Sequence, residues 1–172
     1  MKKVKFIALM VLTAMLGTML AACGNTMTVK VTIKLDEKYI NYMYDKNADN
    51  EEFIIPQEDR VILNDVDIPI KHKEGEKISV IRVFREAAAN YGIDTYQLTE
   101  DELSIESIKN YKKEYATIDG EAVTFFWSYT INGIEPKEGR AGTNYVKDGD
   151  KVVFMLTSAS ESEYKEDTRE LP

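Results

Sequence analysis

Residues 122–131 constrain the fold more than any other segment, because they combine a β-type composition with a turn signal at each end. The run reads Ala-Val-Thr-Phe-Phe-Trp-Ser-Tyr-Thr-Ile, and its β-branched and aromatic residues favour a strand. Asp119-Gly120 precedes the run and Asn132-Gly133 follows it, and both dipeptides are typical of tight turns. Another turn signal, Lys147-Asp148-Gly149-Asp150, leads into a final strand predicted over 151–156. The sequence therefore predicts strands joined by tight turns.

Two further segments predict another strand and a helix. Residues 28–35 have an apolar side chain at every odd position, which indicates a strand with one solvent-exposed face. Over 78–91, apolar residues recur every three or four positions, which indicates a helix with Ser79 as its N-cap and Gly92 just after its last turn. Pro69 makes the end of the apolar stretch 61–70 a poor position for a central strand. The predicted fold class is α+β.

Two charged segments are harder to assign. We interpret residues 36–60, which hold three tyrosines and an acidic stretch, as a long inserted loop with a short strand near 53–55. Residues 99–115 are rich in Glu and Lys, which suits a helix, but their apolar residues fit a short strand equally well. The tail, residues 158–172, is polar and charged, and we expect it to be loosely ordered.

Composition excludes several classes of function. Without residues 1–22, the chain has 30 acidic and 19 basic residues, a net charge of −11, which repels nucleic acid. A single cysteine excludes an intramolecular disulfide and any multi-thiolate metal site. A single histidine, His72, lies between two lysines and is best interpreted as a surface residue, which leaves little equipment for acid–base catalysis. We therefore predict that the protein is not an enzyme.

The N-terminus has the layout of a secretory signal peptide. Lysines in residues 1–5 precede an apolar run over 6–22, whose length of about 26 Å is marginal for crossing a hydrocarbon core of about 30 Å. The run ends in Leu-Ala-Ala followed by Cys23, which resembles the lipobox of bacterial lipoproteins. That resemblance implies cleavage of residues 1–22, a diacylglyceryl anchor on Cys23, a tether over 23–27 and a location at the outer face of the cytoplasmic membrane. The alternative is an uncleaved anchor beside a free cysteine.

Three motifs in the last third of the chain also point to a family. They are the strand and turn over 127–133, a glycine-containing stretch that ends in Tyr145, and the turn and strand over 147–154. They resemble the domain of unknown function related to the C-terminal domain of transcobalamin and intrinsic factor, which is common in secreted and lipid-anchored proteins of Gram-positive bacteria. The resemblance covers residues 28–157, with 36–60 as an insertion. It implies a β-grasp-like fold, a twisted mixed sheet with one packed helix.

The candidate ligand-binding residues are Trp127, Tyr129, Asn132 and Tyr145. Two-residue periodicity places Trp127 and Tyr129 on one strand face, which is either a stacking platform for a planar ligand or, as we favour, part of the core. In transcobalamin-like proteins the corrin ring lies between this domain and a separate helical domain. We therefore expect that a corrinoid site here would be exposed or completed by a partner.

Asp45, Asn47 and Asp49 alternate in the way that oxygen ligands do in a calcium loop. However, Asn50 stands where that loop needs glycine, and Pro56 stands where it needs a bidentate glutamate. A solvated acidic loop is therefore the favoured interpretation, and we predict no cofactor.

Two kinds of non-enzymatic function compete. The first is a membrane-anchored module that uses the aromatic strand and adjoining turns to bind a small molecule, such as a corrinoid, or a glycan. The second is an adhesion or protein-interaction module of the cell envelope, with Tyr39, Tyr42 and Tyr44 as contacts, since tyrosine is enriched at interfaces. We choose the first as the prediction.

Overall fold

The computed structural model describes residues 24–160, and in that range the chain is α+β, as predicted. Most of its residues in regular secondary structure lie in strands. The strands are β1 (Asn25–Leu35), β2 (Val61–His72), β3 (Ile78–Ser79), β4 (Tyr96–Leu98), β5 (Ile105–Ile108), β6 (Tyr111–Lys112), β7 (Glu114–Ile118), β8 (Glu121–Ile131), β9 (Tyr145–Val146) and β10 (Lys151–Ser160). The helices are α2 (Glu37–Lys46), α3 (Gln57–Arg60) and α4 (Val80–Tyr91). Among residues 24–160, no helix is long and apolar enough to cross a membrane.

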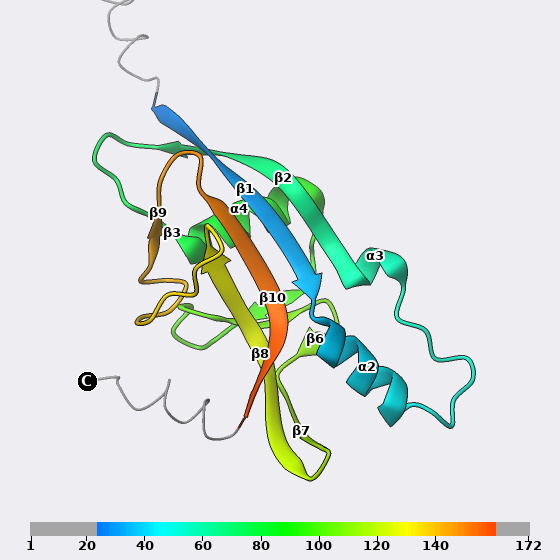
Figure 1. Ribbon diagram of the computed structural model, residues 1–172. Helices are drawn as coiled ribbons and strands as arrows, with labels where there is room; N and C mark the ends of the chain where they lie inside the picture. Colours follow the sequence, from blue (N-terminus) through cyan, green and yellow to red (C-terminus); the bar gives the residue numbers. More distant parts are fainter. Residues whose placement is uncertain (1–23, 161–172) are drawn as a thin grey trace, which may run out of the picture.

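The main sheet has five strands in the order β2-β1-β10-β8-β7 (Figure 1). The first and last strands, β1 and β10, lie side by side in its middle and run parallel, while the other neighbours are antiparallel. With α4 packed across one face, this twisted mixed sheet has the predicted β-grasp-like arrangement. Pro69 lies in β2, an edge strand, as its missing N–H requires.

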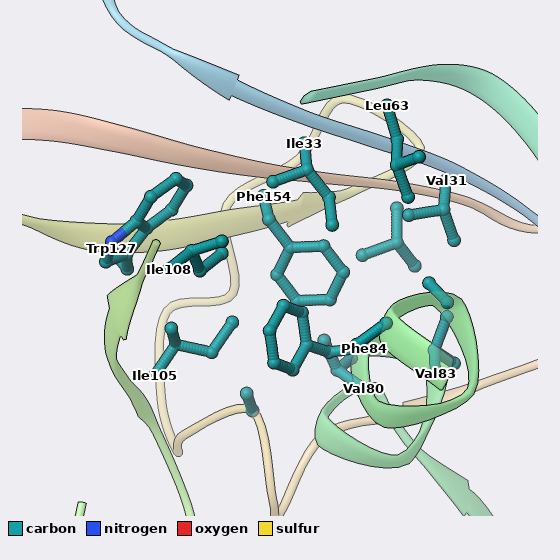
Figure 2. Close-up of a cluster of buried hydrophobic side chains, with 14 of the residues drawn as sticks. Val31, Ile33, Leu63, Val80, Val83, Phe84, Ile105, Ile108, Trp127 and Phe154 are labelled. Carbon is teal, nitrogen blue, oxygen red and sulfur yellow. The ribbon is translucent and has the colours of Figure 1, made fainter. Parts of the chain in front are cut away.

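Alternating side chains of the central strands build the core. The odd-numbered apolar residues of β1 are all buried, as the sequence pattern predicts. The ring of Phe84, on α4, meets the ring of Phe154, on β10, with centroids 5.5 Å apart (Figure 2). The predicted ends of α4 are confirmed, since the Ser79 hydroxyl accepts from the Arg82 N–H and Gly92 adopts a left-handed conformation.

The prediction of an inserted loop over 36–60 with a short strand near 53–55 is wrong in part, because the segment contains two short helices in addition to α4, and residues 53–55 form no strand. Residues 37–46 form α2 and residues 57–60 form α3. The Asp36 carboxylate caps α2 by accepting from the Lys38 N–H at 2.8 Å. Tyr39 lies on the inner face of α2, is buried, and packs edge-on against Phe125. Its apolar ring, together with the partly buried Ile40 and Met43, anchors the helix on the core.

Strand boundaries also differ from the prediction. The segment that fits a helix or a strand forms strands, since 105–108, 111–112 and 114–118 are β5, β6 and β7. β1 begins at Asn25, inside the predicted tether, and β10 continues to Ser160, inside the predicted loose tail. In each case pairing with a neighbouring strand extends the element beyond its apolar residues.

The tight turns are confirmed. Asp119-Gly120 joins β7 to β8, and both residues have positive φ angles of 53° and 84°. Asn132 and Gly133 have positive φ angles of 54° and 79° in the turn after β8. Two consecutive positive φ angles define the tight turn that matches the twist of paired strands.

Candidate functional site

The predicted aromatic row lies in the core. The side chain of Trp127 is buried, with the residue 8% exposed, and its indole N–H donates to the backbone carbonyl of Tyr111 at 2.9 Å. Figure 2 shows its ring beside Ile108, within the cluster of buried side chains. Phe125, in the same row, is fully buried. The strand face thus faces the sheet–helix layer, and a stacking platform at Trp127 is not present.

The other three predicted ligand residues hold turns and loops together or lie apart on the surface. The Tyr129 hydroxyl accepts from the Asn144 amide at 2.8 Å. The Asn132 side chain accepts from the Lys151 N–H at 2.9 Å and donates to Asp150 at 2.8 Å, which ties its turn to β10. Tyr145 is 51% exposed on the short strand β9. These contacts give Tyr129 and Asn132 structural roles.

The alternating oxygen ligands do not form a calcium loop. Asp45 lies inside α2 and Asn47 caps its C-terminus, with the Asn47 amide donating to the Met43 carbonyl at 2.8 Å. In an extended loop, side chains two positions apart can bring their oxygens to one ion. On a helix, side chains two positions apart point to different sides, so the helical backbone at Asp45 does not direct its carboxylate toward Asn47. Within residues 24–160, no three His, Cys, Asp or Glu side chains are grouped so as to hold a metal ion. Cys23, the predicted lipidation site, lies outside the described residues.

An open groove of about 960 Å³ lies between α2 and β7. In Figure 1 the two elements lie side by side at the lower end of the sheet. The α2 wall consists of two rows of side chains, and within each row the residues are four positions apart along the helix. One row holds Glu37, Asn41 and Asp45, and the other holds Lys38, Tyr42 and Lys46. The opposite wall is β7 from Tyr115 to Ile118, with Asp119 of the turn.

A fixed cluster holds the two walls together near the start of β7. The Tyr42 ring stacks on Phe125 with centroids 5.0 Å apart, and its hydroxyl donates to Glu114 at 3.2 Å. The Lys46 ammonium forms an ion pair with the same carboxylate. Burial, together with the charge of Glu114, raises the pKa of Tyr42, and the hydrogen bond to Glu114 raises the pKa of Lys46. At neutral pH Tyr42 is therefore a neutral donor, and the charge of Lys46 is balanced by Glu114.

The rest of the groove is acidic and partly aromatic. Its walls carry the carboxylates of Asp36, Glu37, Asp45 and Asp119 and the ammonium of Lys38. Tyr115 is 72% exposed, and the Lys113 ammonium lies 5.2 Å from the centre of its ring. Glu114 pairs with Phe125, which packs on α2, so the alternating side chain of Tyr115 points to the opposite face of the β7–β8 hairpin. The groove facing α2 is therefore lined mainly by polar groups, with Tyr42 and Ile118 as aromatic and apolar parts of its walls, and such a surface can hold a polar or cationic ligand.

Sequence reasoning missed this groove because its walls come from distant segments. Tyr42 and Glu114 are hydrogen-bonded although 72 positions separate them in the chain. One local signal was available: the N-cap residue Asp36 and the four-residue spacing of Glu37, Asn41 and Asp45 indicate a helix with one polar face.

Comparisons with known proteins give little further guidance. No protein-family model matches the chain, and no curated protein matches it. Among solved structures, a "putative metal binding protein" from Ruminococcus gnavus ATCC 29149 is similar, with 13% sequence identity and a TM-score of 0.37. The similarity covers 77% of this chain and 98% of that chain. The resemblance to transcobalamin-type domains stays a prediction.

Proposed function

We propose that the protein is a lipid-anchored binding module at the outer face of the cytoplasmic membrane, and that its ligand lies in the groove between α2 and β7. It recognises this ligand and does not transform it. The main support is the groove itself, an open concave surface of about 960 Å³ beside the exposed Tyr115 of the β7–β8 hairpin. Ligand sites are concave and combine apolar or aromatic surface with a few placed polar groups. Asn41 and Lys38 supply such groups on the α2 wall.

The anchor is argued from the sequence around Cys23. β1 begins at Asn25, two positions after this cysteine, so a lipid on Cys23 would hold the sheet close to the membrane surface. Two acyl chains, at about 0.8 kcal/mol per buried CH₂, make a durable anchor. We expect a Cys23→Ala variant to leave the membrane fraction or keep residues 1–22, and its intact mass to lack the lipid. A Cys23→Ala variant that keeps both its membrane association and the mass of a lipidated, cleaved chain would contradict the anchor.

The ligand class follows from which aromatic rings remain accessible. A corrinoid stacked on Trp127 is not supported, because that indole is buried. The predicted tyrosine contact surface is also reduced. Tyr39 is buried, and the Tyr44 hydroxyl accepts from Arg60 at 2.7 Å and from the Ile55 N–H at 3.3 Å. Tyr115 is thus the accessible ring, and a glycan or a protein segment that extends from the groove over the edge of β7 would pack on it.

The groove is tested by NMR titration of the full-length chain in detergent micelles, with soluble glycans, corrinoids and short peptides as probes. We expect one class to shift the amide signals of β7 and α2, and a Tyr115→Ala substitution to weaken its binding. Tyr145→Ala is the matched control, since Tyr145 is also an exposed tyrosine with a lysine, Lys77, over its ring. If all shifts map to residues outside the groove, or if Tyr145→Ala has the larger effect, the proposed site is wrong.

A further inference from the structure

The two edges of the main sheet are built differently. At the β2 edge, Asp65 has a positive φ of 52° beside an irregular pairing register, and Pro69 lacks an N–H. The Arg82 guanidinium also donates to the carbonyl of Lys71 at 2.7 Å. Bulges, prolines and covering side chains are the devices that stop an edge strand from pairing with another chain. β2 is therefore a protected edge.

The β7 edge has none of these devices in its five residues, Glu114–Ile118. β7 pairs with β8 through a two-residue turn, and Ile118 and Glu121 flank that turn. In such a hairpin the flanking residues exchange hydrogen bonds, and every second residue points its backbone groups outward. The N–H and C=O groups of Tyr115 and Thr117 therefore point away from β8.

The groove lies along this outward edge, because residues 115–118 form its β7 wall. An extended peptide that paired with β7 would occupy the groove and bring its side chains against α2. The α2 wall carries Glu37 and Asp45, and Asp36 and Asp119 add to the negative charge. Of the two lysines in the walls, Lys46 is paired with Glu114, which leaves Lys38 against four carboxylates. Charge complementarity therefore favours a peptide that carries lysine or arginine.

We infer that the groove binds an extended basic polypeptide segment, which adds a strand to β7. This inference rests on the proposed function and names the ligand class of that same site. Backbone hydrogen bonds to Tyr115 and Thr117 supply the pairing, and the peptide's side chains alternate between the two faces of the extended sheet. Those on the face away from α2 pack on the exposed ring of Tyr115, and those on the other face meet the carboxylates of α2, which select their charge. The protein would then act as a surface receptor for a basic partner segment.

Other occupants fit the charge less well. Residues 161–172 of this chain hold five acidic and two basic residues, so they would be repelled by the walls of the groove. A second copy that paired through its own β7 would bring an equally acidic groove alongside the first. Both are outcomes that the experiment distinguishes.

The test uses the full-length chain in detergent micelles and a fluorescent nine-residue peptide with lysine at positions 1, 5 and 9, separated by threonine and valine. Glu37 and Asp45 are eight residues apart, about 12 Å along α2, which four residues of an extended peptide span. The control peptide has glutamate in place of each lysine. Anisotropy titrations give the dissociation constants.

The informative substitution is Thr117→Pro, with Thr117→Ala as its matched control. Proline removes the outward N–H but leaves the inner pairing with β8 in place, whereas alanine removes only the side chain. We expect Thr117→Pro to weaken binding of the lysine peptide at least about tenfold, as the loss of one or two hydrogen bonds would. Thr117→Ala should bind within about threefold of the natural chain. Circular dichroism confirms that both variants fold.

Charge is tested separately with the double variant Glu37→Gln, Asp45→Asn. We expect weaker binding of the lysine peptide and a smaller effect of added salt. Equal binding of the lysine and glutamate peptides would overturn the charge argument.

Three further results would overturn the inference. The first is equal binding by Thr117→Pro and the natural chain. The second is self-association of the natural chain that Thr117→Pro abolishes, which would make a second copy the occupant. The third is a glycan or corrinoid that binds in the groove while neither peptide does, which would leave the proposed function standing. If no probe binds, the proposed function fails as well.

Discussion

Replacing Trp127 with phenylalanine tests the assignment of the aromatic row to the core. The substitution removes the hydrogen bond from the indole to the Tyr111 carbonyl, whose 2.9 Å length and buried position indicate a full interaction. A buried hydrogen bond of this kind is worth about 1 kcal/mol. Phenylalanine also buries about 50 Å² less apolar surface than tryptophan, which costs about another 1 kcal/mol. The space left beside Ile108 adds a cavity cost, so the free energy of unfolding should fall by about 2–3 kcal/mol.

The assay is urea unfolding followed by far-UV circular dichroism, because the variant lacks the tryptophan signal. With a slope of about 2 kcal/mol per molar urea, the midpoint should fall by about 1 M. Tyr145→Phe is the control, since Tyr145 is half-exposed and the change removes only a surface hydroxyl. Its midpoint should stay within about 0.3 M of the natural chain. If Trp127→Phe unfolds at the natural midpoint and loses ligand binding instead, the indole is a binding group and our assignment is wrong.

Two further predictions concern pH. Burial, with the charge of Glu114, raises the pKa of Tyr39 from 10.0 to about 12, so the stability linked to its proton is complete below pH 10 and is lost as pH rises towards 12. In thermal melts between pH 9 and 12, the Tyr39→Phe variant should lose less stability with rising pH than the natural chain, by up to about 2–3 kcal/mol. If both chains lose stability equally over this range, the prediction is wrong. Burial acts to raise the pKa of Asp59, but the contacts of this carboxylate with Lys109 and Tyr111 act to lower it. The net effect is a pKa below the ordinary 3.8. The stability it provides is present above that value and is lost as pH falls through the lowered pKa, so Asp59→Asn should destabilise by about 1–2 kcal/mol at pH 7 and progressively less below pH 4. A constant difference across this range would refute the pairing.

Local signals predicted much of the fold. The alternation in 28–35, the apolar face over 78–91 and the glycine turns each depend on a few neighbouring residues, and each is present in the structure. Caps and turns are local because their hydrogen bonds join residues only a few positions apart, as between Ser79 and Arg82. The ends of elements were less accurate, since pairing with a distant strand extends β1 and β10.

α2 was missed because its burial comes from tertiary contacts. Its tyrosines and the acidic stretch after it were interpreted as a loop, whereas the packing of Tyr39 and Tyr42 on Phe125, with Ile40 and Met43 against the core, gives the helix an apolar environment. An amphipathic tyrosine has a ring that can be buried and a hydroxyl that can stay hydrated, so the residue type alone does not say which environment it will have.

The sequence by itself determined the periodicity, caps and turns, and hence strands joined by tight turns with a helix, while the mixed sheet was implied by the resemblance to a family. It also determined which rings share a strand face, but not whether that face is covered. Only the tertiary structure decided that Trp127 is buried while Tyr115 is exposed, and only it placed α2 beside β7, which is an edge strand within residues 24–160. The physical reason is that burial and edge exposure depend on what packs against a residue, and here the packing elements lie about seventy positions apart in the chain.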